Sequence, residues 1–166
     1  MGRLRNNIIK RYRNAIDDAR KALGSDATVY YKTGNKIAYT GLWDDINKEV
    51  VDIEEAPDGN FYLDEIKSKI IKVTTSRVGV SLRYIPYDLV GGNLDINDVF
   101  ISAKLEDVLI DASDKTSKTI FHQATKIIIN EGANEEVLIP KTSPLKYGLA
   151  GDLYSCGLIA RIDGSA

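Results

Sequence analysis

The sequence predicts a mainly β protein, a small antiparallel β-barrel or sandwich with an N-terminal α-helix and long loops. Three observations lead to this fold class. Only the first ~25 residues show helical periodicity, about eight short β-rich runs follow, and turns containing Gly or Pro separate those runs. Because no second helical pattern alternates with the strands, a parallel α/β architecture is not expected.

The expected helix covers residues 6–23. Its apolar side chains recur at three- and four-residue steps, so they form one stripe that needs a surface to pack against. Asn6 or Asn7 can cap the start, and Gly24 is expected to end the helix in the left-handed conformation. The stripe comprises Ile8, Ile9, Tyr12, Ala15, Ile16, Ala19, Ala22 and Leu23.

The next expected elements are three short strands. Residues 28–32 and 36–40 would form a hairpin across the turn at residues 33–35. Residues 48–53 would form a strand that ends at Pro57-Asp58-Gly59-Asn60, where Pro fixes one backbone dihedral and Gly supplies the positive one.

A long strand at residues 66–75 precedes the clearest alternation in the chain. Residues 78–85 alternate apolar and other side chains up to Pro86, a period of two that predicts a strand. After the turn at Gly91-Gly92, residues 98–103 begin another strand.

The C-terminal part supplies the last strands. Residues 125–130 and 136–139 flank Glu131-Gly132-Ala133-Asn134, a hairpin signal, and residues 153–162 alternate again. The predicted organisation is a single domain, residues 1–166. Its helix would lie in 1–25 and its barrel in 26–166, with an acidic insert at 44–65.

Cysteine usage and hydropathy restrict the compartment. The lone Cys156 cannot form an intrachain disulfide and has no cysteine partner for a metal site, so we expect a reducing compartment and no metal or cofactor. No signal-type apolar run follows Met1, and stretches such as residues 127–129 are too short to span a membrane. A soluble protein made in the cytoplasm, without a membrane partner, is therefore expected.

Candidate catalytic groups are few. His122 is the only histidine, no Gly-x-Ser-x-Gly motif is present, and Cys156 lies on the apolar face of the last expected strand. Adjacent carboxylates such as Asp17-Asp18 point apart and do not form an acid/base pair by themselves. We expect no enzymatic activity and no catalytic residue.

The net charge of −2 conceals an uneven distribution. Residues 1–32 are basic, whereas residues 44–65 are acidic and contain Lys48 as their only cation. Such charge runs are either solvated faces or surfaces that meet an oppositely charged partner.

Residues 73–162 present their elements in a distinctive order. The pieces are a strand ending at Arg83-Tyr84-Ile85-Pro86, the turn Gly91-Gly92, a strand entered at Asp98, the apolar Val108-Leu109-Ile110, the strand 125–130, and a closing strand that ends at Arg161. In this order the chain resembles the head-closure, or stopper, proteins of the bacteriophage neck. Those proteins are usually small β-barrels with long loops that work in a ring, and the long N-terminal helix and acidic insert depart from their common pattern.

The resemblance implies a structural virion protein located in the neck. Such a protein joins the portal or adaptor of the phage head to the tail and helps to retain packaged DNA by assembling into a ring. Its expected partners are copies of itself, the portal or adaptor protein, the tail terminator or tail tube proteins, and genomic DNA that passes through the lumen without sequence-specific binding.

This role gives the charge asymmetry a physical meaning. An acidic lumen would limit DNA binding, because every neutralised phosphate adds a favourable term and would slow transit. The candidate lumen or subunit-interface residues are Asp44, Asp45, Glu49, Asp52, Glu54 and Glu55. The helix could dock on an acidic partner through Arg3, Arg5, Lys10, Arg11 and Arg13.

An alternative function belongs to a different class. The chain could be a monomeric β-barrel that binds a carbohydrate or a peptide, with Trp43 and tyrosines such as Tyr30 and Tyr31 as its contact platform.

Overall fold

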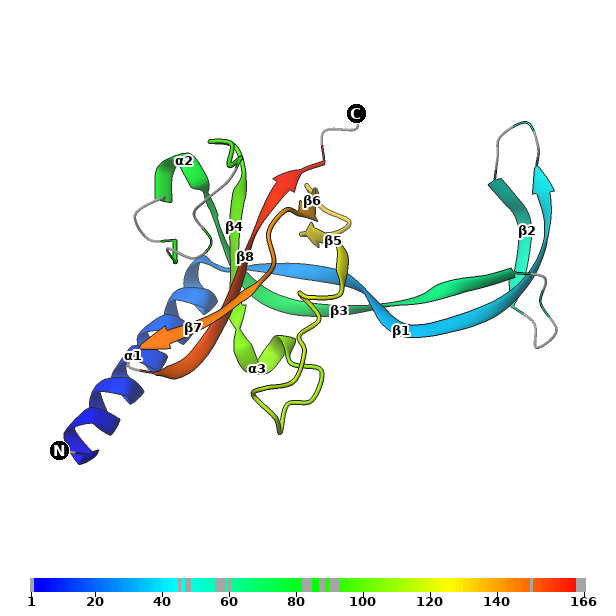
Figure 1. The fold of residues 1–166 in the computed structure, drawn as a ribbon. Helices are drawn as coiled ribbons and strands as arrows, with labels where there is room; N and C mark the ends of the chain where they lie inside the picture. The colour runs from blue at the N-terminus through cyan, green and yellow to red at the C-terminus, as the bar shows by residue number, and fades with distance from the viewer. Residues whose placement is uncertain are drawn as a thin grey trace. The chain divides into compact units, whose positions relative to one another are not determined.

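A computed structural model of the chain describes residues 2–44, 46, 49–55, 59, 61–81, 85–86, 89, 93–149 and 151–163. The elements, in order, are α1 (Gly2–Leu23), β1 (Ser25–Asp44), β2 (Glu49–Glu55), β3 (Phe61–Arg77), α2 (Val78–Ser81), β4 (Val99–Lys104), α3 (Leu105–Val108), β5 (Ala124–Ile129), β6 (Glu136–Pro140), β7 (Leu145–Leu149) and β8 (Asp152–Ile162) (Figure 1). The predicted fold class, mainly β with an N-terminal helix, is confirmed.

The chain divides into two compact units. One contains Met1–Tyr31 and Ser68–Ala166, and the other is the inserted segment Lys32–Lys67. The acidic insert expected at residues 44–65 falls within the second unit, where β2 and the first part of β3 take up most of it. None of the described helices is both long and apolar enough to cross a membrane.

The strands are joined in a ring. Their order is β2-β1-β3-β4-β8-β6-β5. A further pairing of β1 with β5 closes the strands from β1 to β5 in this order into a ring, and β2 pairs with β1 outside it. All these pairs are antiparallel: β3–β4, β4–β8, β8–β6, β6–β5 and β5–β1. β7 also pairs with β8 in antiparallel fashion. The result is the antiparallel, barrel-like sheet that the sequence predicted.

The inner face of the ring forms the main core. β4 and β8 lie side by side (Figure 1), and alternate residues of each point inward because strand side chains alternate with a period of two. This confirms the alternation predicted for residues 98–103 and 153–162. The inward side chains of the two strands are Val99, Ile101, Ala103, Cys156, Leu158 and Ala160, and all are buried.

The outer face of this strand pair is covered as well. Ile159 belongs to a second apolar cluster with Val78, Ile85 and Leu89, and Phe100 packs against that cluster. Burial on both faces removes more apolar surface from water than a sheet with one solvated face would, which stabilises this part of the fold further.

Gly157 allows Phe100 to lie on the outer face. A Cβ at residue 157 would lie 2.7 Å from Phe100 Cε2 and 2.9 Å from the carbonyl oxygen of Ile101. A side chain there would therefore displace both the ring and the neighbouring strand.

We expect Gly157→Ala to lower the free energy of unfolding by about 1–3 kcal/mol, because the added methyl group overpacks a filled site. Urea denaturation at neutral pH measures the change. The same substitution in a Phe100→Leu background should cost less, since the smaller side chain can move aside. An equal cost in both backgrounds would show that the ring is not the obstacle.

The strand predicted at residues 78–85 is wrong in its first half, and residues 82–84 lie outside the described residues. Residues 78–81 form α2, and Val78 is buried while Val80 is 85% exposed, so the alternation there does not mark a sheet face. The chain leaves the ladder after the Arg77↔Val99 pair, where the Gly79 N–H donates to the Ile96 carbonyl at 3.0 Å. Gly79 permits this close approach, because a Cβ there would contact Ile96 at 3.0 Å.

The hairpin predicted between residues 28–32 and 36–40 is also wrong. Both segments belong to the single long strand β1, and Gly34 takes a positive φ of 91° inside it without reversing the chain. The first segment pairs with β5, which is distant in sequence, and the later part of β1 pairs with β2, the next strand along the chain. The chain therefore reverses after Asp44 and not at residues 33–35. In contrast, the hairpin predicted between residues 125–130 and 136–139 is confirmed as β5 and β6.

The helix is present, but Gly24 ends it for a different reason than expected. Gly24 does not take the left-handed conformation. Its N–H donates to the Arg20 carbonyl at 2.9 Å, and a Cβ would lie only 2.9 Å from the Val73 carbonyl oxygen. Glycine therefore serves the close passage of the chain over β3.

Candidate functional site

A row of polar side chains fixes α1 to the barrel. Arg13, Asp17 and Arg20 are spaced by four and three residues, which places them on one face of the helix. They contact Asp152, Tyr154 and Ser155 of β8, in that order. We call this row of contacts the helix seam.

The outer end of the helix seam is an ion pair. Arg13 Nε donates to Asp152 Oδ2 at 2.8 Å, and Arg13 Nη2 donates to the second carboxylate oxygen, so the pair is bidentate. Its hydrogen bond to Asp152 raises the pKa of the Arg13 guanidinium, and the same bond lowers the pKa of the Asp152 carboxyl.

The middle of the helix seam is a tyrosine bound to a carboxylate. Tyr154 Oη donates to the two oxygens of Asp17 at 2.6 and 2.7 Å. Arg13 and Lys104 lie 5.2 and 5.5 Å from the centre of the Tyr154 ring, within the range of cation–π attraction. Burial and the neighbouring Asp17 raise the pKa of the Tyr154 hydroxyl.

The inner end of the helix seam is Arg20, which is only 5% exposed. Its Nη2 donates to Ser155 Oγ at 2.9 Å and to Ser102 Oγ at 3.2 Å, and the Ser102 hydroxyl also bonds the Tyr147 hydroxyl. Arg20 Nε and Nη1 are buried without a hydrogen-bond partner among the described residues. Burial lowers the pKa of the guanidinium, because the charged form loses hydration.

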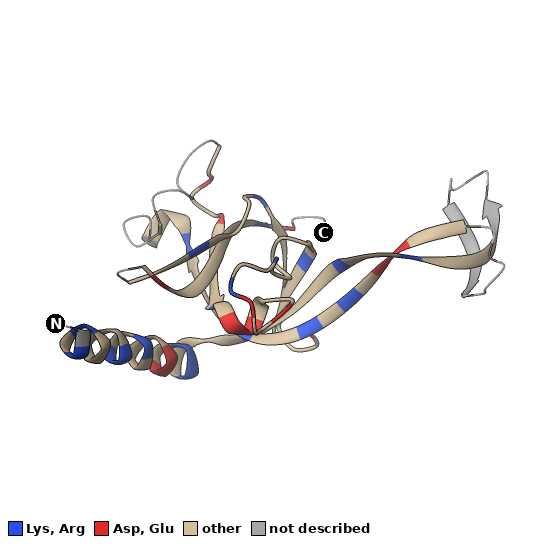
Figure 2. Cartoon of the chain, turned by 60° about the horizontal axis from the view of Figure 1, so that its bottom comes forward, with Lys and Arg blue, Asp and Glu red and all other residues tan. Residues whose placement is uncertain are grey.

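One residue of the predicted docking surface of α1 is bound to the barrel. Lys and Arg residues recur along the helix (Figure 2), and Arg3, Arg5, Lys10 and Arg11 are exposed. Arg13 is different, because its guanidinium is held by Asp152.

The apolar stripe of α1, expected to pack on the barrel or on a neighbouring subunit, packs on the barrel only in part. Leu23 is 81% exposed and Ile8 is 52% exposed, whereas Ile9, Tyr12 and Ile16 are half-buried. The polar row docks on the barrel instead, and it turns part of the stripe toward solvent.

The side chains of the predicted acidic site lie outside the described part of the chain. Asp45 lies outside the described residues. The backbones of the other five belong to β1 and β2, and their side chains also lie outside the described part. The five are Asp44, Glu49, Asp52, Glu54 and Glu55.

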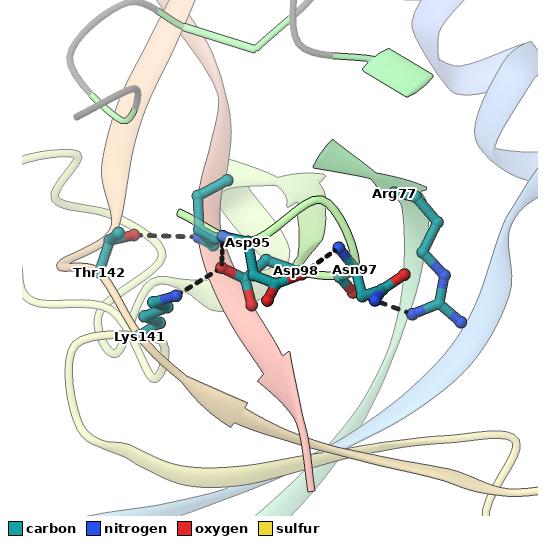
Figure 3. A network of polar contacts seen from close by, with 7 residues as sticks. Arg77, Asp95, Asn97, Asp98, Lys141 and Thr142 are labelled. Atoms are coloured by element: carbon teal, nitrogen blue, oxygen red, sulfur yellow. Dashed lines mark hydrogen bonds and ion pairs between the residues drawn. The ribbon is translucent and has the colours of Figure 1, made fainter. Parts of the chain in front are cut away.

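A buried polar network at the entry to β4 was not predicted (Figure 3). Asp98, 4% exposed, accepts from the Asp95 N–H at 2.8 Å and from Lys141 Nζ at 2.6 Å. Beside it, Arg77 Nη1 donates to the Asn97 carbonyl at 3.1 Å. Burial raises the pKa of the Asp98 carboxyl, but the Asp95 N–H and Lys141 outweigh burial, so this pKa lies below its ordinary value.

We expect Asp98→Asn to lower the free energy of unfolding by about 1–3 kcal/mol at neutral pH, because the amide cannot pair with the Lys141 ammonium. The pKa of Asp98 is lower in the folded than in the unfolded chain. Its contribution is therefore present above the unfolded pKa of about 4 and lost as the pH falls through the folded value.

Urea denaturation between neutral pH and pH about 3 tests this, since the difference between Asp98→Asn and wild type should shrink on acidification. Asp18→Asn changes an exposed aspartate of α1 and should show neither effect. A difference that is constant with pH would contradict the role assigned to the carboxylate.

The candidate nucleophile and base have structural contacts. Cys156 is buried in the core, and burial raises the pKa of its thiol to about 11, so it is protonated at neutral pH. His122 Nδ1 bonds Thr119 Oγ1 at 2.7 Å, and burial lowers the pKa of the imidazole. Within the described residues, no group of three or more His, Cys, Asp or Glu side chains is arranged to hold a metal ion.

The aromatic platform of the alternative function is not assembled by described side chains either. The Trp43 side chain lies outside the described part of the chain. Tyr30 donates its hydroxyl to Glu131 at 2.6 Å, and Lys126 lies 4.8 Å from the centre of its ring. No family model matches the chain, and no curated protein matches its sequence.

Proposed function

We propose that the chain is a structural component of a bacteriophage neck. It would join the portal or adaptor of the head to the tail as a ring of identical copies and help to retain packaged DNA. One observation carries this proposal, namely that the inserted unit Lys32–Lys67 has no fully buried side chain among its described residues.

The described side chains of this unit give it little to stabilise it alone. Two-stranded ribbons are marginal in water unless an apolar face is covered. On β3, Tyr62 is 68% exposed and Ile66 is 45% exposed, with Leu63 between them also exposed. Exposed apolar side chains on a long β segment are typical of surfaces that meet another protein, because water contact there is unfavourable. Contact with a neighbouring copy would bury them.

The helix offers a second surface for a neighbour. Exposed apolar side chains such as Leu4 and Ile8 lie on the same helix as the basic side chains of Lys10 and Arg11. An apolar patch beside positive charge suits an acidic partner, because the charges guide association and apolar burial then stabilises the complex.

Serine substitutions at Tyr62 and Ile66 test assembly through the inserted unit. We expect Tyr62→Ser/Ile66→Ser to leave the melting temperature nearly unchanged, since both side chains are exposed, and to reduce ring formation and incorporation into particles at least tenfold. Analytical ultracentrifugation and particle composition give the two measurements.

A matched control changes exposed apolar residues of the other unit. Val80→Ser/Ile110→Ser removes two side chains of comparable exposure and should assemble normally. If both double variants assemble like wild type, the inserted unit is not the assembly surface. A wild-type chain that stays monomeric and is missing from particles would favour the alternative, a monomeric binding module.

The acidic stretch supplies a test of the DNA channel. Reversing Asp52, Glu54 and Glu55 to Lys would place phosphate-binding charge in the lumen, and DNA ejection should slow, more at low than at moderate salt. Reversing the exposed Asp18, Glu106 and Glu135 changes the net charge equally and should leave ejection normal. Ejection by the first variant that matches wild type at both salt concentrations would remove the lumen assignment.

A further inference from the structure

A pocket of about 220 Å³ lies where α1 meets the barrel, beside Arg20. Ile16 and Ala19 of α1 and Phe100 of β4 give it apolar walls. Four residues with hydroxyl groups also border it, namely Thr74, Ser102, Tyr147 and Ser155. The pocket is therefore mostly apolar, with hydroxyl groups and one cationic side chain at its boundary.

Arg20 has no directly bonded anion among the described residues. The residue is only 5% exposed, and its hydrogen bonds go to the neutral hydroxyls of Ser102 and Ser155. Burial lowers the pKa of its guanidinium, and Asp17 and Asp107 counter that shift only through space. Two nitrogens of Arg20, Nε and Nη1, are buried without any acceptor in the described part of the chain. Buried charges in proteins are normally paired through hydrogen bonds, and Arg20 has no such anion among the described residues.

Arg13 provides a comparison on the same helix face. Its guanidinium is less buried than that of Arg20, and yet it holds Asp152 in a bidentate pair. The more buried of the two arginines is thus the one without a carboxylate. The contrast indicates that a carboxylate bound directly to Arg20 would not come from the described residues.

We propose that this pocket binds an organic carboxylate with a short aliphatic stem. The carboxylate would accept hydrogen bonds from the Arg20 guanidinium and from neighbouring hydroxyls, and its stem would contact Ile16, Ala19 and Phe100. A guanidinium donates to both oxygens of a carboxylate in a planar fork. The apolar walls disfavour inorganic phosphate, which would lose hydration on several oxygens against them.

The carboxylate can reach the pocket from two sources with the same chemistry. It is either a small organic acid or the Asp or Glu side chain of a neighbouring protein copy, and the second case rests on the proposed function. Both sources predict that the NMR signal of Arg20 shifts when a carboxylate binds. They differ in whether the shift requires an added acid or a higher protein concentration.

The test follows the Nε–H signals of Arg20 and Arg13 by NMR in the full-length, ¹⁵N-labelled protein. Titration with butyrate should shift the Arg20 signal and saturate at roughly millimolar concentrations, as for a small ligand with few contacts. The Arg13 signal should not move, because Asp152 occupies its donors. Butanol and inorganic phosphate, at matched ionic strength, should leave the Arg20 signal in place.

Two variants test the location without touching the arginine. Ala19→Leu fills the pocket from an exposed helix position and should abolish the response to butyrate. Ala15→Leu makes the same change at an exposed position one turn earlier, outside the pocket lining, and should respond like wild type.

A concentration series without butyrate separates the two sources. An Arg20 shift that grows with protein concentration and disappears in Ala19→Leu identifies a carboxylate from a neighbouring copy. A shift that needs butyrate identifies a small acid. The proposal is overturned if Arg20 shifts in neither series, if phosphate shifts it as much as butyrate does, or if Ala19→Leu retains the response.

Discussion

The antiparallel pairing of β4 with β8 is the interaction on which the other parts of the barrel depend. Its inner face supplies a large part of the core, and its outer face is covered by two different elements. Ser102 and Ser155 lie under α1, while Phe100 and Ile159 lie under the segment that follows β3. The polar end of the strand pair binds the polar face of α1, and its apolar end packs against the apolar segment after β3. The side chains of the two strands therefore determine which element covers each end.

The polar end explains why α1 is amphipathic without burying its full apolar stripe. Serine hydroxyls offer hydrogen bonds but little apolar area, so the helix docks with Arg13, Asp17 and Arg20. That orientation leaves part of the stripe in water, including Ile8. Hydrogen bonds between protein groups replace bonds to water and stabilise only modestly, whereas apolar burial is the larger contribution per side chain. The polar contacts therefore set the orientation of the helix, while the apolar area it buries contributes less to its docking than a fully buried stripe would.

The sequence predicted the elements that carry a local signal. The hairpin of β5 and β6 surrounds Gly132, which has a φ of 91°, and the alternation within β4 and β8 marks the side chains that enter the main core. The sequence pattern divides β1 at Gly34, because the pairing of its first segment with β5, far away in sequence, has no local signal. Arg20 could not be distinguished from the other cations of the helix, because no sequence motif around a single residue predicts that it is buried. The three- and four-residue spacing of Arg13, Asp17 and Arg20 was the only signal.

Arg20, which bonds no anion among the described residues, connects the position of the helix with occupancy of the pocket. α1 and the strands each contribute to the pocket lining, so the complete site exists only while the helix is docked on the barrel. A carboxylate held there would bind the docked arrangement and not the undocked one. A ligand that binds one of two arrangements shifts the equilibrium toward it by its difference in affinity. A carboxylate bound to Arg20 would then stabilise the docked helix, and with it the direction in which the exposed stripe and the basic side chains of α1 face a neighbour. Under the proposed function, a carboxylate from an adjacent copy would make helix docking depend on ring assembly.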